Sequence, residues 1–471
     1  MNERCAVVGV STFKELNILN YLYEGLSALQ HRGQESVGVS IYLQGISSYY
    51  SMGLVSESTI FSNLITGTLA IGHNRYSTMG SSTLENAQPV QMKSKYGVDY
   101  AFAFNGNVRN FEELQKEYSD ESIPISDSDS ILMAYLLGNE LGGEPIEETF
   151  RKAAPKIDGA YSIVMLIGGS NPRLVAIRDP LGFRPLCIGK NGDGYFIASE
   201  SAAFTEPYMN VQFVRDVEPG EIIILNGNDI ESKMVYESNR YSHCMFEWVY
   251  FSRPDSVIDG VPVYDVREKL GRHLASDSFI DADLVIPVPD SGRGAAVGYS
   301  FVSGTPLREG FQLDRYKYRR IFIMPEQSER EKKATKKLNV IESAVNGKRV
   351  VVIDDSIVRG TNMKNMVINK LRKAGAKQIH VRISCPPLMD RCPYGVDFHR
   401  GELIASKFEG ETHLEICKKV GDELGADSVY YNTIQNLLDS ISLPADKLCL
   451  RCLSRKSLVS NFSQESQSLI T

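Results

Sequence analysis

Two neighbouring carboxylates mark the clearest candidate site of this 471-residue chain. The apolar run VVVI, residues 350–353, leads into Asp354 and Asp355, and a short loop containing Gly360 and Thr361 follows. Loop N–H groups, a threonine hydroxyl and the N-terminus of a following helix suit a phosphate, and glycine lets the backbone approach it closely. The carboxylates suit ribose hydroxyls, Mg²⁺, or both. An acidic surface turn is disfavoured because these features occur together.

Cysteine spacing gives a second candidate site. Cys449 and Cys452 form a C-x-x-C pair, and Cys244 and Cys392 lie upstream of it. In a reducing compartment, metal ligation or catalysis is a better functional hypothesis for cysteines than disulfide bonding. Zinc, redox chemistry and an iron–sulfur cluster are comparably plausible for a C-x-x-C pair alone. A buried, inert thiol is the alternative at each position.

Composition limits the class of protein. Hydrophobic residues make up 42% and charged residues 23% of the chain, as in ordinary globular proteins. The net charge of −7 argues against sequence-independent nucleic-acid binding, which needs basic side chains. No apolar run approaches the ~20 residues that span a bilayer, and we expect no secretory signal. We therefore expect a cytoplasmic protein with neither a nucleic-acid nor a membrane partner.

The elements that would position these residues differ between the two halves of the chain. The first half alternates short apolar runs with turn signals, which predicts mainly strands and a few helices. Strands are expected at 5–10, 68–77, 100–108, 160–168, 173–180 and 194–199, a hairpin at 218–231, and helices at 14–32 and 128–141. The second half predicts helices at 263–275 and 362–376 and strands at 282–292, 348–355 and 377–386. Strand, helix and strand at this spacing indicate a parallel sheet.

The loop after the two carboxylates resembles the phosphoribosyl-pyrophosphate (PRPP) loop of type I phosphoribosyltransferases. In that family the acids hold the ribose hydroxyls and support Mg²⁺, and the loop binds the 5-phosphate. The resemblance implies PRPP-binding roles for Asp354, Asp355, Ser356, Arg359, Gly360 and Thr361. The segment PVPDSGRGAA, residues 287–296, resembles the family's pyrophosphate-binding turn and implies Asp290, Ser291 and Gly292. Residues 315–325 stand where the family has a loop that closes over PRPP, with Arg319 and Ile321 as departures.

Five segments of the first half resemble class II glutamine amidotransferases. They are CAVVGV, LQHRGQES, GHNRYSTMGSS, FNGNVRN and SDSDS, in this order. The resemblance implies an N-terminal nucleophile (Ntn) domain with four layers, in which two sheets lie between two layers of helices (αββα). It also implies the following site residues: Cys5 as nucleophile, Asn105 and Gly106 as the oxyanion hole, and Arg32, Arg75 and Asp129 as glutamine-binding residues.

The implied nucleophile explains the first four residues. A cysteine attacks a carboxamide only when a base accepts its proton. An N-terminal cysteine carries such a base, because an α-amine has a pKa of ~8 and is partly neutral near pH 7. The amine of Cys5 becomes free only if Met1–Arg4 are removed. We therefore expect residues 1–4 to be a propeptide.

In combination, the two halves resemble the glutamine PRPP amidotransferases of the iron–sulfur type. This implies a two-domain α/β and α+β fold, with the Ntn domain at 5–235 and a type I phosphoribosyltransferase domain, built on a mainly parallel sheet, at 236–471. Glutamine would be hydrolysed and its ammonia channelled to PRPP, the first committed step of purine synthesis. Purine nucleotides would inhibit a homotetramer. A regulatory paralogue without turnover is the alternative, and it is disfavoured by the complete glutaminase set.

The resemblance also bears on the cysteines. Cys244 in HCMFEWVYFSRPDS, Cys392 in RCPYGVDF and the terminal C-x-x-C match the cluster ligands of that type. It implies a [4Fe–4S] cluster held by Cys244, Cys392, Cys449 and Cys452, with zinc as the second possibility. A structural role is expected, because the overall reaction transfers no electrons.

Overall fold

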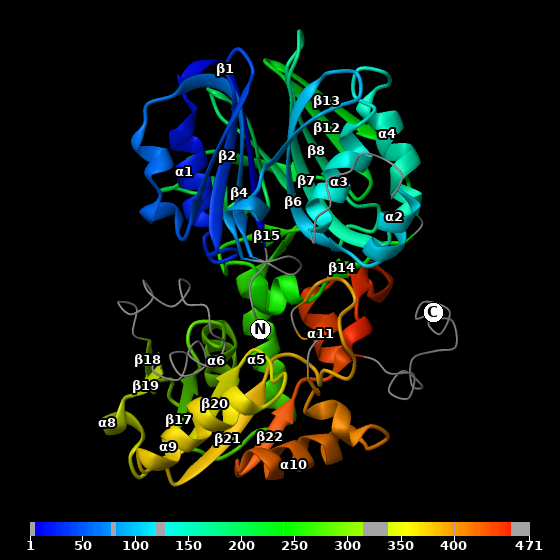
Figure 1. Ribbon diagram of the computed structural model, residues 1–471. Coiled ribbons are helices and arrows are strands. Elements are labelled where there is room, and N and C mark those ends of the chain that lie inside the picture. The colour runs from blue at the N-terminus through cyan, green and yellow to red at the C-terminus, as the bar shows by residue number, and fades with distance from the viewer. Residues whose placement is uncertain are drawn as a thin grey trace.

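The computed structural model describes residues 5–76, 82–118, 128–238, 240–313, 338–396, 398 and 401–453. The chain forms two parts, one stacked above the other (Figure 1). The upper part, coloured blue to cyan with some green, contains two sheets packed face to face between helices. The lower part, coloured green to red, contains one central sheet with helices around it.

The first sheet of the upper part has seven strands in the order β11-β9-β10-β1-β4-β2-β3, and its neighbouring strands are antiparallel. Helix α1, Ile18–Ala28, covers its outer face. The strands are β1 Ala6–Asn17, β2 Ser36–Tyr42, β3 Ile46–Met52, β4 Thr66–Arg75, β9 Cys187–Lys190, β10 Gly194–Ala198 and β11 Gln212–Asp216.

The second sheet has six strands in the order β13-β12-β8-β7-β6-β5, again antiparallel. Helices α2, α3 and α4 lie on its outer face (Figure 1). The elements are β5 Val90–Lys93, β6 Asp99–Val108, β7 Gly159–Ile167, β8 Arg173–Arg178, β12 Glu221–Asn226, β13 Asp229–Met234, α2 Phe111–Glu117, α3 Asp129–Gly138 and α4 Ile146–Ala153.

Alternation along the strands produces the four layers. In β1, Val8 and Val10 pack in the apolar cluster under α1, whereas Val7 packs in the cluster between the two sheets. In β6, Phe102 belongs to the cluster under the helices, and Ala103 belongs to the cluster between the sheets. Because successive side chains of a strand point to opposite faces, apolar residues at both sets of positions give each sheet two buried faces. This is the predicted αββα arrangement.

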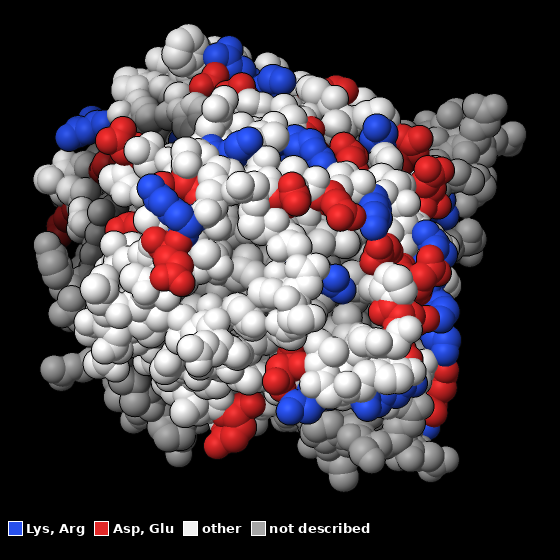
Figure 2. Space-filling view, turned by 90° about the horizontal axis from the view of Figure 1, so that it is seen from above, with Lys and Arg blue, Asp and Glu red and all other residues white. Residues whose placement is uncertain are grey.

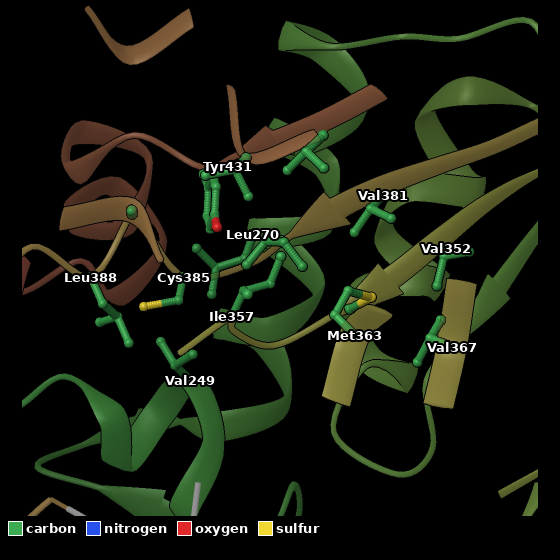
Figure 3. Packing of buried hydrophobic residues seen from close by; sticks show 14 of the residues in the cluster. Val249, Leu270, Val352, Ile357, Met363, Val367, Val381, Cys385, Leu388 and Tyr431 are labelled. Atoms are coloured by element: carbon green, nitrogen blue, oxygen red, sulfur yellow. The ribbon is translucent and has the colours of Figure 1, made fainter. Parts of the chain in front are cut away.

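The lower part is built on four parallel strands in the order β17-β20-β21-β22. Helical residues Met363 and Val367 pack against Val352 of β20 and Val381 of β21 (Figure 3). The elements are β17 Leu284–Pro287, β18 Phe311–Leu313, β19 Leu338–Val340, β20 Arg349–Asp354, β21 Gln378–Ile383, β22 Ser428–Tyr431, α5 Val263–Asp277, α6 Arg293–Ser303, α8 Glu342–Val345, α9 Asn369–Lys373, α10 His413–Leu424 and α11 Ile434–Ile441. The predicted parallel sheet is confirmed.

Short strands of the second half of the chain lie at the junction between the two parts. The chain leaves the upper sheets at Met234, and the predicted domain boundary at residue 235 lies in the connection that follows. Strand β14, His243–Cys244, then pairs in parallel with β23, Leu448–Cys449, near the other end of the chain. A small hairpin of β15, Val257–Ile258, and β16, Val261–Pro262, lies close to this junction.

Two predicted helices differ from the structure. The helix expected at 14–32 begins only at Ile18, because β1 continues past an irregularity in its pairing until Leu16 and Asn17 pair with β4. The helix expected at 362–376 begins with a π-helical segment, Met363–Ile368, and continues as α9. The other helices and strands predicted above are present with shifted ends, and the hairpin turns at Gly227 as expected.

Surface charge and hydropathy bear on the expected partners. On the face of the upper part seen in Figure 2, acidic and basic side chains of the described residues are interspersed. Among the residues described by the structure, no helix combines the length and the apolar character that a membrane crossing requires.

Candidate active sites

Cys5 stands immediately before β1, at the end of the strand where Ala6 pairs with Asn74 of β4. Its Sγ donates to the Tyr76 carbonyl over 3.3 Å and accepts from the Tyr76 N–H over 3.4 Å. Burial raises the pKa of the thiol to about 11, and the Tyr76 backbone and the Arg75 guanidinium only partly oppose this. The thiol is therefore protonated at neutral pH, and a nucleophilic role needs a base close to it.

The predicted oxyanion-hole residues lie at the end of β6. Asn105 is buried, and its Nδ2 has no hydrogen-bond partner among the described residues. A Cβ at Gly106 would lie 2.4 Å from the Ala160 carbonyl oxygen of the neighbouring strand, so only glycine fits there. A buried amide donor without a partner suits an anion that forms only during a reaction.

Charged side chains surround Cys5. Arg75 of β4 donates from Nη1 to Glu35 Oε1 over 2.7 Å, and Asp129 is the first residue of α3. The Asp129 carboxylate accepts from the Val108 N–H over 3.1 Å. Burial raises the pKa of Asp129 to about 6, against the opposing effects of backbone N–H groups and Arg75. Glu35, Arg75 and Asp129 all act electrostatically on the Cys5 thiol, so the structure brings them together.

Arg32, which the resemblance assigns to glutamine binding, has several buried partners. Its side chain is fully buried and forms ion pairs with Glu200 and Glu247. Its Nη2 also donates to Ser252 Oγ over 3.0 Å. Because Glu247 and Ser252 follow the predicted domain boundary, Arg32 joins the two parts of the chain. The sequence analysis missed both of these glutamates, which no local motif connects to Arg32, and it also missed Glu35, which lies within LQHRGQES.

The PRPP-loop carboxylates lie at the carboxyl end of β20, where ligands of parallel sheets bind. Asp355 accepts from Ser291 Oγ over 2.7 Å and from Ser356 Oγ. Burial raises the pKa of Asp354 well above its usual range, and the charge of Asp355 adds to this effect. The structure therefore brings the predicted phosphate loop and the predicted pyrophosphate turn side by side, with two adjacent carboxylates between them.

Two glycines allow this close approach. Gly360 has a φ of +79°, which favours glycine, and a Cβ there would lie 2.6 Å from Ile404. A Cβ at Gly292 would lie 2.3 Å from the Ile353 carbonyl oxygen, at the end of β20. Arg359 and Thr361 are exposed, as is Asp290, which forms an ion pair with Arg293 over 3.2 Å.

The four predicted cluster cysteines come from three distant segments. Cys244 and Cys449 are paired residues of the parallel strands β14 and β23. Burial raises the pKa of the Cys452 thiol, and the charges of Cys392 and Cys449 raise it further. The charges of Cys244 and Cys392 also act on Cys449, so the four thiols lie in one neighbourhood. None of the four forms a disulfide. Within the described ranges, no group of three or more His, Cys, Asp or Glu side chains is arranged to hold a metal ion.

Two predicted segments fall outside the part of the chain that the structure describes. The proposed closing loop, residues 315–325, and the propeptide, residues 1–4, lie outside the described residues. Cys187 and Cys417 are buried.

Comparison with known proteins identifies the family. The amidophosphoribosyltransferase of Methanocaldococcus jannaschii is 41% identical over 475 residues, covering 96% of this chain and 97% of that protein. The chain belongs to the amidophosphoribosyltransferase family. The Bacillus subtilis member is 37% identical over 97% of this chain and 94% of its own. A family model for a glutamine amidotransferase domain matches residues 73–206.

Solved structures agree with this assignment. The glutamine PRPP amidotransferase from B. subtilis, complexed with ADP and GMP, superposes with a TM-score of 0.83 at 36% identity and covers 96% of each chain. A structure described as the allosteric regulatory enzyme of purine biosynthesis matches this chain equally well, with the same TM-score and identity. The predicted fold class and enzyme class are confirmed: the chain is an enzyme of purine biosynthesis that acts as an amidophosphoribosyltransferase.

Proposed function

We propose that Cys5 hydrolyses glutamine and that the ammonia passes through the interior to C1 of PRPP. The products are 5-phosphoribosylamine, glutamate and pyrophosphate. The observation that carries the proposal is the grouping around Cys5 of an Arg–Glu pair and the buried Asp129 carboxylate. Asp129 accepts from the Val108 N–H of β6, the strand that also carries the unpartnered Asn105 amide. A PRPP loop with its acid pair lies on the other part of the same chain.

The first step is proton removal from the Cys5 thiol. Burial raises the pKa of this thiol to about 11, so few thiolates exist at neutral pH unless a base is adjacent. The α-amine of Cys5 is such a base once Met1–Arg4 are removed, because it is partly neutral near pH 7. Sulfur then attacks the carboxamide carbon, and the amine returns the proton to the departing ammonia.

The surrounding residues hold the substrate and the intermediate. Asn105 Nδ2 and the Gly106 N–H donate to the oxyanion, which has no equivalent in the ground state. Arg75, fixed by Glu35, pairs with the α-carboxylate of glutamine, and Asp129 accepts from its α-ammonium group. Arg32 is proposed as a further glutamine-binding residue. Glu200, Glu247 and Ser252 hold its guanidinium, and its Nη1 has no partner among the described residues.

The second site binds PRPP through the loop after β20. The Ser356–Thr361 loop binds the 5-phosphate, with Arg359 beside it, and Gly360 allows the close approach. Asp290, Ser291 and Gly292 bind the pyrophosphate group. The Asp354–Asp355 pair fits a divalent cation, because burial and the charge of Asp355 raise the pKa of Asp354, and a cation would offset both effects. Bound Mg²⁺ would neutralise the pyrophosphate leaving group.

For the four cysteines we propose a [4Fe–4S] cluster, with zinc as the second possibility; in a cluster each thiolate binds a different iron. The pairing of Cys244 with Cys449 in β14 and β23, and the charges of Cys392 and Cys449 that act on Cys452, support a shared site. The cluster would fasten the C-terminal segment to β14.

Assembly, regulation and location follow from the family. We infer a homotetramer and inhibition by purine nucleotides, consistent with the ADP and GMP bound to the B. subtilis protein. A cytoplasmic location suits an iron–sulfur cluster and eight cysteines that form no disulfide in the structure.

Pyrophosphate release by the Cys5→Ser variant tests the proposed function. Glutamine-dependent release should disappear, whereas ammonia-dependent release from PRPP should persist, because the second site needs only ammonia. An Asp355→Asn variant should lose both. Retention of glutamine-dependent release by Cys5→Ser would refute the proposed nucleophile.

A further inference from the structure

The turn that begins at Cys392 reaches from the lower part of the chain to the upper part. Asn107 of β6 donates from Nδ2 to the Pro393 carbonyl over 3.5 Å. The rings of Phe183 and Tyr394 lie 4.3 Å apart, centroid to centroid. This turn, residues 392–395, therefore packs directly on the glutaminase part.

Gly395 makes the tightest contact of the turn. Its φ is +85°, and a Cβ at this position would lie 2.6 Å from Asn107 Cβ. The preceding carbonyl, that of Tyr394, accepts from the buried guanidinium of Arg184. Any side chain at residue 395 would therefore require both an unfavourable backbone conformation and a displacement of Asn107.

Asn107 is close to the proposed oxyanion hole along the same strand. Asn105 and Asn107 lie two residues apart in β6, so their side chains share one face of the sheet. Both pair in register with β7, opposite Ser162 and Ala160. A shift of β6 at Asn107 therefore moves the Asn105 amide as well.

We propose that the 392–395 turn positions the oxyanion hole, with Gly395 and Asn107 as positioning residues for glutamine hydrolysis. The inference rests on the proposed roles of Asn105 and Gly106. It assigns a catalytic consequence in the upper part to a turn of the lower part. Neither residue contacts the reacting atoms; both act through the position of β6.

The turn also connects this strand to the proposed cluster. The Tyr394 N–H donates to Cys392 Sγ over 3.4 Å. A cluster that held Cys392 would fix one end of the turn, and Asn107 would hold the other. The cluster would then support glutamine hydrolysis as well as the C-terminal segment.

Kinetics of a Gly395→Ala variant of the full-length, processed enzyme test the proposal. Glutamine-dependent kcat should fall about tenfold to a hundredfold, since a displacement of about 1 Å can cost this much. The KM for glutamine and the ammonia-dependent rate should stay close to wild type. Alkylation of Cys5 by iodoacetamide should be unchanged, because direct displacement at carbon forms no oxyanion.

A matched variant and a rescue separate positioning from general damage. Gly410 has a φ of +90° with open space around it, so Gly410→Ala introduces comparable backbone strain without the contact. It should leave both activities near wild type. Asn107→Gly in the Gly395→Ala background removes the atom that the new methyl group would meet, and it should partly restore kcat. If Gly395→Ala does not fold, Gly395→Asn takes its place, because asparagine tolerates positive φ.

Three results would overturn the inference. The first is that Gly395→Ala loses glutamine-dependent and ammonia-dependent activity equally. The second is that Gly395→Ala has the same kinetics as Gly410→Ala. The third is that adding Asn107→Gly to Gly395→Ala restores no glutamine-dependent kcat. The proposed function would fail differently, because wild-type enzyme would then lack glutamine hydrolysis that depends on Cys5.

Discussion

The buried contacts of Arg32 predict that Arg32→Met destabilises the junction between the two parts of the chain. The Arg32 guanidinium binds Glu200 through Nε and Glu247 Oε2 through Nη2, the latter over 2.6 Å. All three side chains are almost completely buried. Removal of one partner from a buried ion pair leaves an uncompensated charge and typically costs about 3–5 kcal/mol.

The two glutamates are affected unequally. Glu200 keeps other donors, including Ser256 Oγ at 2.6 Å and the Arg253 N–H at 2.9 Å. Glu247 keeps the hydrogen bond from Ser252 Oγ, at 2.9 Å, and the electrostatic attraction of Arg267, and its Oε1 has no partner within the described part of the chain. The double variant Arg32→Met/Glu247→Gln removes the less compensated charge, so it should recover about 1–3 kcal/mol of the loss.

Urea unfolding followed by tryptophan fluorescence measures these effects. Trp248 is the single tryptophan of the chain, is fully buried and adjoins Glu247, so its emission reports on this junction. Arg151→Met is the matched control, because Arg151 and its partner Glu148 are about half exposed. Its loss should stay below about 1 kcal/mol.

The pH dependence gives a second criterion. Burial would raise the pKa of Glu200, but Arg32 and His31 outweigh it and hold this pKa below its usual range. Wild-type enzyme therefore keeps this stabilisation above the unfolded pKa, ~4.3, and loses it only as pH falls through the lower folded pKa. In Arg32→Met the buried Glu200 carboxylate takes up a proton more readily, so the deficit should shrink from pH 7 toward pH 5. A loss no larger than that of Arg151→Met, or a double variant as unstable as the single one, would refute the reasoning.

Three further predictions concern the two sites. Asn105→Ala should lower glutamine-dependent kcat about 10²- to 10³-fold. Ammonia-dependent activity, measured as pyrophosphate release, should change little. Equal effects on both activities would argue against an oxyanion role. Burial raises the pKa of Asp129 to about 6, and only the ionised carboxylate pairs with the substrate ammonium group. The KM for glutamine should therefore rise as pH falls below about 6. An Asp129→Asn variant should lack this rise. Gly360→Ala should raise the KM for PRPP in both assays, whereas Gly347→Ala, at a φ of +72° in open space, should not; similar kinetics for the two variants would contradict the close approach at the loop.

Local chemistry made much of the fold and of both sites predictable. Asp354 and Asp355 stand at the end of the apolar strand β20. Gly360, in the loop that follows them, has the positive φ that favours glycine. Short apolar runs between turn signals predicted most strands of the two upper sheets. The parallel sheet followed from the spacing of strand, helix and strand. These features depend on neighbours in the sequence, which a pattern can reveal.

Contacts between distant segments could not be predicted from local patterns. The motif around Arg32 gave no sign of its partners Glu200 and Glu247, which lie 168 and 215 residues away along the chain. The pairing of Cys244 with Cys449 uses strands of two residues, which are too short to give a periodic signal. The start of α1 moved to Ile18 because pairing with β4 overrides the helical periodicity before it. In each case, tertiary contacts determined the outcome.

The fate of the amide nitrogen of glutamine tests the central claim most directly. Processed, cluster-loaded enzyme would receive PRPP, glutamine labelled with ¹⁵N in its amide, and an excess of unlabelled ammonium. If ammonia released at Cys5 passes through the interior to PRPP, the phosphoribosylamine formed through the glutamine-dependent reaction should retain the label. Product labelled only in proportion to the mixed ammonia pool would contradict the account, because it would show that the nitrogen leaves the protein before it reaches PRPP.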